Sequence, residues 1–302
     1  MTIGGKSVRL FLVDGSPGGL VTAEIMNWTG HILAGPRSDL PALMRRDEAH
    51  RTGVYLLLGD APDSLGGIQV YIGEGDEISS RLTIHAREKD FWERAILLTS
   101  KDANLTKAHA RYLESRLLQI AREAERAELT NGTAPPPIAL PEADISDMEY
   151  FITQALIALP VLGVNVLRSP ITALKHSEPS SSASFPTRAP RFTFVQQREN
   201  LTAHATEIDG EFIVLAGSEA RQTQVGKGSY VALRQQLERD GTIDTSQRPA
   251  LFAKDHVFAS PSAAAAVIAG RSANGRTAWA EDSTGLAYGA WQNRDLDEVG
   301  HG

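Results

Sequence analysis

Five side chains in the first half of the chain have the chemistry that hydrolysis of a phosphodiester requires. They are two tyrosines, an arginine, a histidine and a glutamate: Tyr55, Tyr71, Arg81, His85 and Glu114. A guanidinium presents a planar fork of donors that matches a phosphate group and stays charged at any relevant pH. A carboxylate can hold one Mg²⁺ or Mn²⁺. A tyrosine hydroxyl can activate water when a cation stabilises its phenolate or a nearby imidazole accepts its proton.

Each of these residues also has a structural interpretation when it is considered alone. The two tyrosines are typical of strand residues in a core, and Arg81 is typical of a solvated helix surface. His85 could be structural, and Glu114 beside Arg111 could belong to a surface charge cluster that contributes little to stability. The joint pattern is what favours a site, since Arg81 and His85 are four residues apart and would share one face of a helix.

The secondary-structure elements predicted around these residues are both strands and helices. Alternating apolar residues predict strands at 53–58 and 68–72, joined as a hairpin by a loop rich in Gly, Asp and Pro. A helix is expected over 76–86, a third strand over 91–98, and a long amphipathic helix over 106–126. The tyrosines would therefore lie on the hairpin, Arg81 and His85 on the first helix, and Glu114 on the second.

Two short motifs on the hairpin carry a family resemblance. Gly53-Val-Tyr55 and Tyr71-Ile-Gly73, followed by Arg81, His85 and Glu114, resemble the signature of the GIY-YIG nuclease superfamily. The resemblance covers about a quarter of the chain. It implies a metal-dependent endonuclease with these five residues as its catalytic set, Glu114 as the ligand of Mg²⁺ or Mn²⁺, and either tyrosine as the group that activates water. DNA is favoured over RNA as the substrate, in restriction, phage defence or repair.

Some positions depart from the family pattern. Branches of the family carry Lys three residues after the second tyrosine, where this chain has Glu74. Asn131 is the nearest candidate for an Asn that often follows the glutamate helix. Lys107 and Arg111 precede Glu114 on the same helix and are candidate phosphate contacts. Because Glu74 adds an anion near the expected phosphate, the alternative function is a catalytically weakened nucleic-acid-binding or protein-interaction module on the same fold.

The last third of the chain predicts a separate α+β domain. Its Ser260-Pro-Ser-Ala-Ala-Ala and Arg271-Ser-Ala-Asn-Gly-Arg-Thr-Ala-Trp279 segments resemble a domain of unknown function that recurs behind GIY-YIG modules. Arg271, Asn274 and Arg276 are candidate nucleic-acid contacts, with Trp279 as a base-stacking ring. The alternative, which we favour for Trp279, is that this ring packs on the core of its own domain.

These patterns divide the chain into five parts. They are an N-terminal β-rich segment (1–49), a GIY-YIG-like domain (50–130), a Pro- and Ser-rich linker with a helix (131–191), an α+β domain (192–292) and a tail (293–302). The fold class is therefore α/β (α+β), with a small mixed sheet flanked by helices and a second small α+β domain. The C-terminal domain is a candidate surface for self-association.

The composition restricts the class of protein further. The 302 residues include no cysteine, which excludes disulfides, zinc–cysteine sites and thiol catalysis and is compatible with a cytoplasmic location. No segment has the pattern of a signal peptide or is apolar over enough residues to span a membrane, so no membrane partner is expected. The formal net charge of -7 excludes a protein that binds nucleic acid through an overall positive charge. Nucleic acid would have to bind through a few basic side chains at the site and a metal ion.

Overall fold

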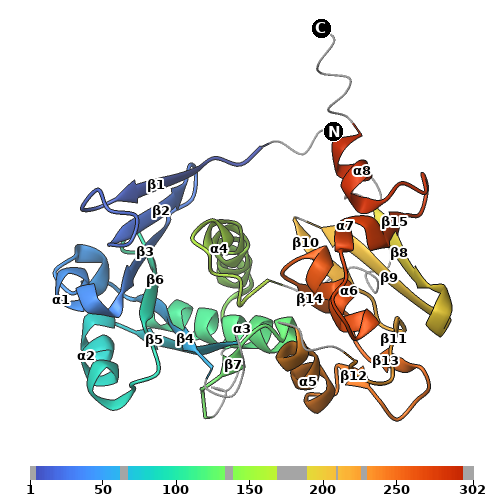
Figure 1. Ribbon diagram of the computed structural model, residues 1–302. Coiled ribbons are helices and arrows are strands. Elements are labelled where there is room, and N and C mark those ends of the chain that lie inside the picture. The colour runs from blue at the N-terminus through green and yellow to red at the C-terminus, as the bar shows by residue number, and fades with distance from the viewer. Residues whose placement is uncertain are drawn as a thin grey trace, which may run out of the picture. The chain divides into compact units, whose positions relative to one another are not determined.

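The structure is a computed structural model that describes residues 5–61, 67–132, 139–168, 189–208, 210–225 and 230–294. The chain divides into two compact units, Met1–Pro170 and Ile171–Gly302. Both units combine strands and helices (Figure 1), which confirms the predicted α+β class. The predicted Ser-rich part of the linker and most of the predicted tail lie outside the described residues.

The first unit is built on one seven-stranded sheet with the strand order β1-β2-β3-β6-β4-β5-β7. Its strands are β1 (Val8–Leu12), β2 (Val21–Ile25), β3 (Gly30–Pro36), β4 (Gly53–Asp60), β5 (Ile68–Gly75), β6 (Arg94–Ser100) and β7 (Glu128–Leu129). Its helices are α1 (Leu40–Leu43), α2 (Ile78–Glu88), α3 (Lys107–Ala124) and α4 (Glu142–Val161), with the 3₁₀ turns η1 (Arg37–Asp39) and η2 (Asp47–His50). Among the strands that the structure describes, β5 and β7 pair in parallel and the others pair antiparallel, so the sheet is mixed.

Helices cover both faces of this sheet, and strand β4 shows why. Its alternate side chains point to opposite faces, and both sets are apolar. Val54 and Leu56 pack in a core with α3 and α4, whereas Tyr55 and Leu57 pack in a second core with α1 and α2. A strand that is buried on both faces reads as a continuous apolar run rather than an alternating one.

The N-terminal strands belong to the same sheet as the predicted hairpin. Strand β3 pairs with β6 from Gly30↔Ser100 to Pro36↔Arg94, and β6 pairs in turn with β4. The expected boundary at residue 49 therefore falls inside one sheet. Helix α4, expected within a linker, packs Phe151 and Ile152 into the core under this sheet. Both differences arise because the apolar faces of these elements are buried by residues distant in the sequence.

The second unit contains a five-stranded sheet in the order β14-β10-β9-β8-β15 and a three-stranded sheet in the order β11-β13-β12. Its strands are β8 (Arg191–Gln196), β9 (Leu201–Ile208), β10 (Glu211–Val214), β11 (Glu219–Ala220), β12 (Ile243–Asp244), β13 (Ala250–Phe252), β14 (His256–Phe258) and β15 (Trp279–Glu281). Its helices are α5 (Val231–Arg239), α6 (Pro261–Ala269), α7 (Gly275–Ala278) and α8 (Tyr288–Asn293), with the 3₁₀ turn η4 (Gln197–Glu199).

Helix α6 forms the centre of the second unit. The Ser260 side chain caps its first turn by accepting from the Ala263 N–H, and Gly270 ends it with φ of 63°. Its alanines are buried, and their small side chains let neighbouring elements approach closely. The Trp279 ring is fully buried in the same core, and its Nε1–H donates to the Pro261 carbonyl at 3.0 Å. The packing role that we favoured for Trp279 is therefore the one observed.

Candidate active site

The β4–β5 hairpin brings the two tyrosines onto one face of the sheet. Tyr55 pairs with Gly73, and Leu57 pairs with Tyr71, so the tyrosines are diagonal neighbours with ring centroids 6.2 Å apart. A Cβ atom at Gly73 would lie 2.5 Å from the Tyr55 hydroxyl oxygen. Glycine at this position therefore leaves the space that the Tyr55 side chain fills.

Helix α2 places His85 against both tyrosines. The His85 Nε2 is 2.9 Å from the Tyr55 hydroxyl, and the imidazole meets the Tyr71 ring edge-on at 4.8 Å between centroids. Burial lowers the pKa of His85, and the positive charge of Lys89 lowers it further, so the imidazole is neutral at physiological pH. The Nδ1 atom is buried and has no hydrogen-bond partner among the described residues.

The two tyrosines differ in their access to solvent. Tyr55 is 1% exposed, whereas Tyr71 is half-buried and has the Lys89 Nζ 4.5 Å from its ring centroid. Burial raises the pKa of both hydroxyls, and the positive charge of Arg81 opposes this rise at both. Arg81 itself is exposed, one helical turn before His85. Tyr71 and Arg81 are thus the members of this cluster that solvent or a ligand reaches.

Helix α3 presents Glu114 to the same region. The helix begins after the N-cap Thr106 and packs on the sheet through Leu113 and Leu117, which border Glu114. Burial and, to a smaller extent, the negative charge of Glu74 raise the pKa of Glu114 to about 7 against the opposing positive charges of Arg111 and Arg81. The charge of Glu114 in turn raises the pKa of both tyrosines. The charge of Glu114 thus reaches both tyrosines and Arg81, although α3 packs in the core on the other face of the sheet from Tyr55.

Glu74 and Glu114 are the oxygen donors of this region. The Glu74 Oε2 atom is buried and has no hydrogen-bond partner among the described residues. Carboxylate oxygens are the ligands that Mg²⁺ and Mn²⁺ prefer, and Mg²⁺ commonly binds one or two carboxylates and keeps several waters. Within the described part of the chain, no group of three or more His, Asp or Glu side chains is placed to hold a metal. The donor set therefore fits a cation that retains most of its water.

Two of the other candidate residues of the first unit, Lys107 and Asn131, are bonded to residues within it. The Lys107 Nζ lies 2.7 Å from the Asp76 carboxylate, so this cation is already paired at the start of α3. Arg111 is exposed one turn before Glu114. Asn131 forms two hydrogen bonds with the backbone of Ile72, accepting from its N–H at 3.1 Å and donating to its carbonyl at 2.7 Å. Asn131 thus covers the edge of β5 between Tyr71 and Gly73.

The predicted contacts of the second unit surround helix α7. The Asn274 side chain accepts from the Arg276 backbone N–H and caps this helix, while the Arg276 guanidinium donates to Gln292 at 2.9 Å. Arg271 is exposed. Because Trp279 is buried, its ring is not available for a base to stack on.

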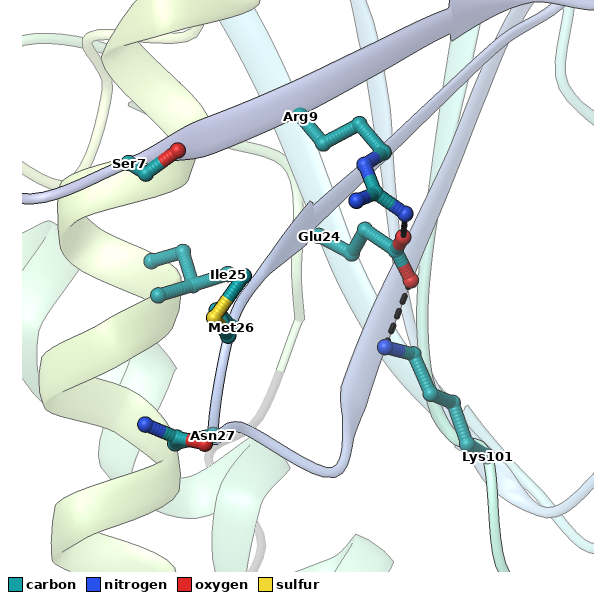
Figure 2. A pocket seen from close by; sticks show the side chains of 7 residues that line it. All are labelled: Ser7, Arg9, Glu24, Ile25, Met26, Asn27 and Lys101. Carbon is teal, nitrogen blue, oxygen red and sulfur yellow. Dashed lines mark hydrogen bonds and ion pairs between the residues drawn. The ribbon is translucent and has the colours of Figure 1, made fainter.

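A pocket of about 260 Å³ lies away from the tyrosine cluster, beside β1 and β2 (Figure 2). The Glu24 carboxylate in its wall lies 3.3 Å from an Arg9 nitrogen and 2.5 Å from the Lys101 Nζ. Glu24 thus partly offsets the positive charge of these two side chains.

Sequence reasoning did not identify Lys89 and Arg37 as residues of this region. Lys89 follows His85 by four residues, which is the spacing that could have indicated a shared helix face. Arg37 gave no signal, because it reaches the end of α2 from a segment about 50 residues earlier.

Comparisons with known proteins describe only the second unit. Residues 193–292 match a family that is described as a domain of unknown function (DUF4357). This match supports the prediction of a C-terminal domain of unknown function. No curated protein and no solved structure matches the chain. None of the helices described here is both long and apolar enough to cross a membrane.

Proposed function

We propose that the hairpin and helices α2 and α3 form a GIY-YIG-like nuclease module that hydrolyses phosphodiester bonds in DNA with Mg²⁺ or Mn²⁺. The observation that carries this proposal is the cluster of Tyr55, Tyr71 and His85, within reach of the charges of Arg81 and Glu114. The match of residues 193–292 to a domain of unknown function supports it, since the sequence resembles a domain that recurs behind such modules.

Each residue has a distinct role in the proposed reaction. Arg81 is exposed and its fork would bind the scissile phosphate and offset its growing negative charge. Tyr71 would orient the attacking water, and the neutral His85 would accept a proton through the hydroxyl network that it shares with Tyr55. Glu114, with Glu74 beside it, would hold the divalent ion, which polarises the phosphate and lowers the pKa of bound water.

The test is cleavage of single- and double-stranded DNA by the purified full chain with Mg²⁺, Mn²⁺ or EDTA. We expect metal-dependent cleavage that falls about 100-fold or more in Glu114→Gln and in Arg81→Ala. Glu123→Gln and Arg122→Ala are matched controls, because both residues are exposed on the same helix as Glu114. Cleavage that persists in Glu114→Gln would refute the proposal.

The alternative is a module that binds nucleic acid or a protein without cleaving. The proximity of Glu74 to Glu114 favours it, because without a cation two carboxylates repel the phosphate that an active site must hold. DNA or RNA that binds the wild-type chain and is not cleaved with either metal would establish this alternative. In that case Arg81→Ala should weaken binding, and neither the variant nor the wild type should form a cleavage product.

A further inference from the structure

Strand β1 forms an open edge of the seven-stranded sheet (Figure 1). Its register with β2 runs from Val8↔Ile25 to Leu12↔Val21, and the Val13 N–H donates to the Leu20 carbonyl at 2.9 Å. Hydrogen-bonded and non-hydrogen-bonded pairs alternate along an antiparallel ladder. The backbone groups of Val8, Leu10 and Leu12 therefore point away from β2, toward a side where no described residue pairs with them.

The side chains of this edge are unusually apolar for a solvated strand. Leu10, Phe11 and Leu12 are 43%, 58% and 37% exposed. Leu10 and Leu12 lie on the face of Ala23 and Val21, which belong to the core under α3 and α4. They therefore extend the apolar face of the sheet into solvent.

Strand β1 has few of the usual protections of an open edge. Native edges carry lysines, prolines or bulges that prevent pairing with another chain. Strand β1 has neither proline nor lysine. Its one charge, on Arg9, turns back toward Glu24 at 3.3 Å (Figure 2). Glu24 also pairs with Lys101, so it offsets the charge of Arg9 only in part, and Arg9 is the one charged side chain of β1 that a second strand would meet.

We propose that β1 pairs antiparallel with β1 of a second copy of this chain, around a two-fold axis at Leu10. In this register Leu10 faces Leu10 of the second copy, Val8 faces its Leu12, and the outward backbone groups of these residues complete the ladder. Apolar residues then meet on one face, and on the other Arg9 faces Phe11. A parallel arrangement in register would place the two Arg9 side chains against each other.

The size of this contact sets the strength of the dimer. Stable interfaces bury about 1,200 Å² or more, and a contact of five paired residues buries less. The dimer is therefore weak, and the fraction of dimer depends on protein concentration. In sedimentation equilibrium we expect the mass to rise from 32.6 kDa toward twice that value between low and high micromolar concentration. The variants L10P and L10K should stay monomeric. Proline is compatible with the fold here because the Leu10 N–H faces the open edge.

The absence of cysteine makes a second readout specific. L10C introduces the only thiol, and the two-fold axis brings it within disulfide range of its copy. Oxidation should therefore crosslink L10C faster than V195C, whose exposed position on β8 lies in the other unit. F11C is the register control, because Phe11 faces Arg9 rather than itself. A mass that stays at 32.6 kDa at all concentrations, or equal crosslinking of L10C and V195C, would overturn the proposal.

Discussion

Burial separates the two tyrosine hydroxyls of the candidate site. Tyr55 is closed off from solvent and bound to His85, whereas Tyr71 is half-buried beneath Lys89. A hydroxyl that touches an attacking water must be reachable from solvent, and Tyr71 is the more exposed of the two side chains. We therefore assign water orientation to Tyr71 and assign to Tyr55 the positioning of the imidazole.

Phenylalanine substitutions at Tyr55 and Tyr71 test the two proposed roles separately. Tyr71→Phe should lower cleavage about 100-fold and Tyr55→Phe about 10-fold, because in the proposed reaction only Tyr71 contacts the water. Tyr55→Phe also leaves the buried His85 Nε2 without its partner and should lower the free energy of unfolding by about 1 kcal/mol. Single-turnover rates and urea denaturation measure the two effects. A larger loss of cleavage in Tyr55→Phe than in Tyr71→Phe would reverse the assignment.

Glu114 makes the stability of the first unit depend on pH. Its pKa is raised from 4.5 in the unfolded chain to about 7. The raised pKa favours the folded state below pH 4.5, and this contribution is lost as the pH rises through 7. Without divalent ions, Glu114→Gln should therefore match the wild type at pH 4 and exceed its stability by about 1 kcal/mol at pH 8, after allowance for solvent screening.

Urea denaturation at the two pH values measures this difference. Glu123→Gln is the control and should follow the wild type at both, because Glu123 is exposed. Adding Mg²⁺ at pH 8 should stabilise the wild type but not Glu114→Gln, since an ion stabilises only the state that binds it. A wild type that is more stable than Glu114→Gln at pH 8 without metal would contradict the raised pKa.

Short-range spacing could predict part of the site but not its electrostatics. Helix geometry places Arg81 and His85, which are four residues apart, on one face of a helix. Hairpin geometry makes the two tyrosines diagonal neighbours. The proximity of Glu74 to Glu114 cannot be predicted from spacing, because it depends on how α3 packs against β5. The spacing of Asn131 from Glu114 is only a loose match to the family pattern, whereas the structure shows Asn131 hydrogen-bonded to the Ile72 backbone.

Helix α2, which carries Arg81 and His85, is fixed at its C-terminal end by Arg37 of η1. The guanidinium donates to the carbonyls of Ala86 and Lys89 at 2.9 Å and of Trp92 at 3.2 Å, and it lies 4.6 Å from the Trp92 ring centroid. The Trp92 Nε1–H in turn donates to the His85 carbonyl at 3.4 Å. Arg37 thus supports the helix that carries the His85 imidazole of the candidate site.

Arg37→Lys tests this support, because lysine keeps the charge and loses the planar fork. It should lower the free energy of unfolding by about 2 kcal/mol and increase amide hydrogen exchange in α2. Arg45→Lys is the control, since Arg45 is exposed and bonds only within its own turn. Unchanged exchange in α2 would show that packing alone holds the helix.

The fold was predictable element by element but not in its strand order. The hairpin, α2, α3 and α6 follow from local periodicity, turn residues and caps. The pairing of β3 with β6 joins residues 58 to 70 positions apart, and many apolar strands could satisfy it. That pairing decides that the N-terminal strands extend the sheet that carries the tyrosines, so the boundary at residue 49 could not be placed correctly from composition.

At the scale of the whole molecule, the two units have separate cores. The residues packed around the seven-stranded sheet all precede residue 170, and those packed around α6 all follow residue 190. Their stabilities should therefore be separable, with the proposed chemistry in the first unit unaffected by damage to the second.

Arg234 provides the test of this separation. It is 1% exposed on α5, and its guanidinium donates to the carbonyls of Val267 and Arg221 and pairs with Glu238 at 2.7 Å. Arg234→Met removes the guanidinium from Arg221, Val267 and Glu238, and among the described residues the Val267 carbonyl keeps only the Gly270 N–H at 3.4 Å, so the change should destabilise the second unit by about 3 kcal/mol. Arg239→Met, exposed on the same helix, should have no effect.

Hydrogen exchange measured peptide by peptide distinguishes separate from joint unfolding. If the units are independent, Arg234→Met raises exchange in α5 and α6 and leaves β4, β5 and α3 as protected as in the wild type. DNA cleavage, where the wild type shows it, should then be unchanged. Equal loss of protection in both units would mean that they unfold as one, and the C-terminal domain would then have to be counted among the elements that hold the tyrosine cluster together.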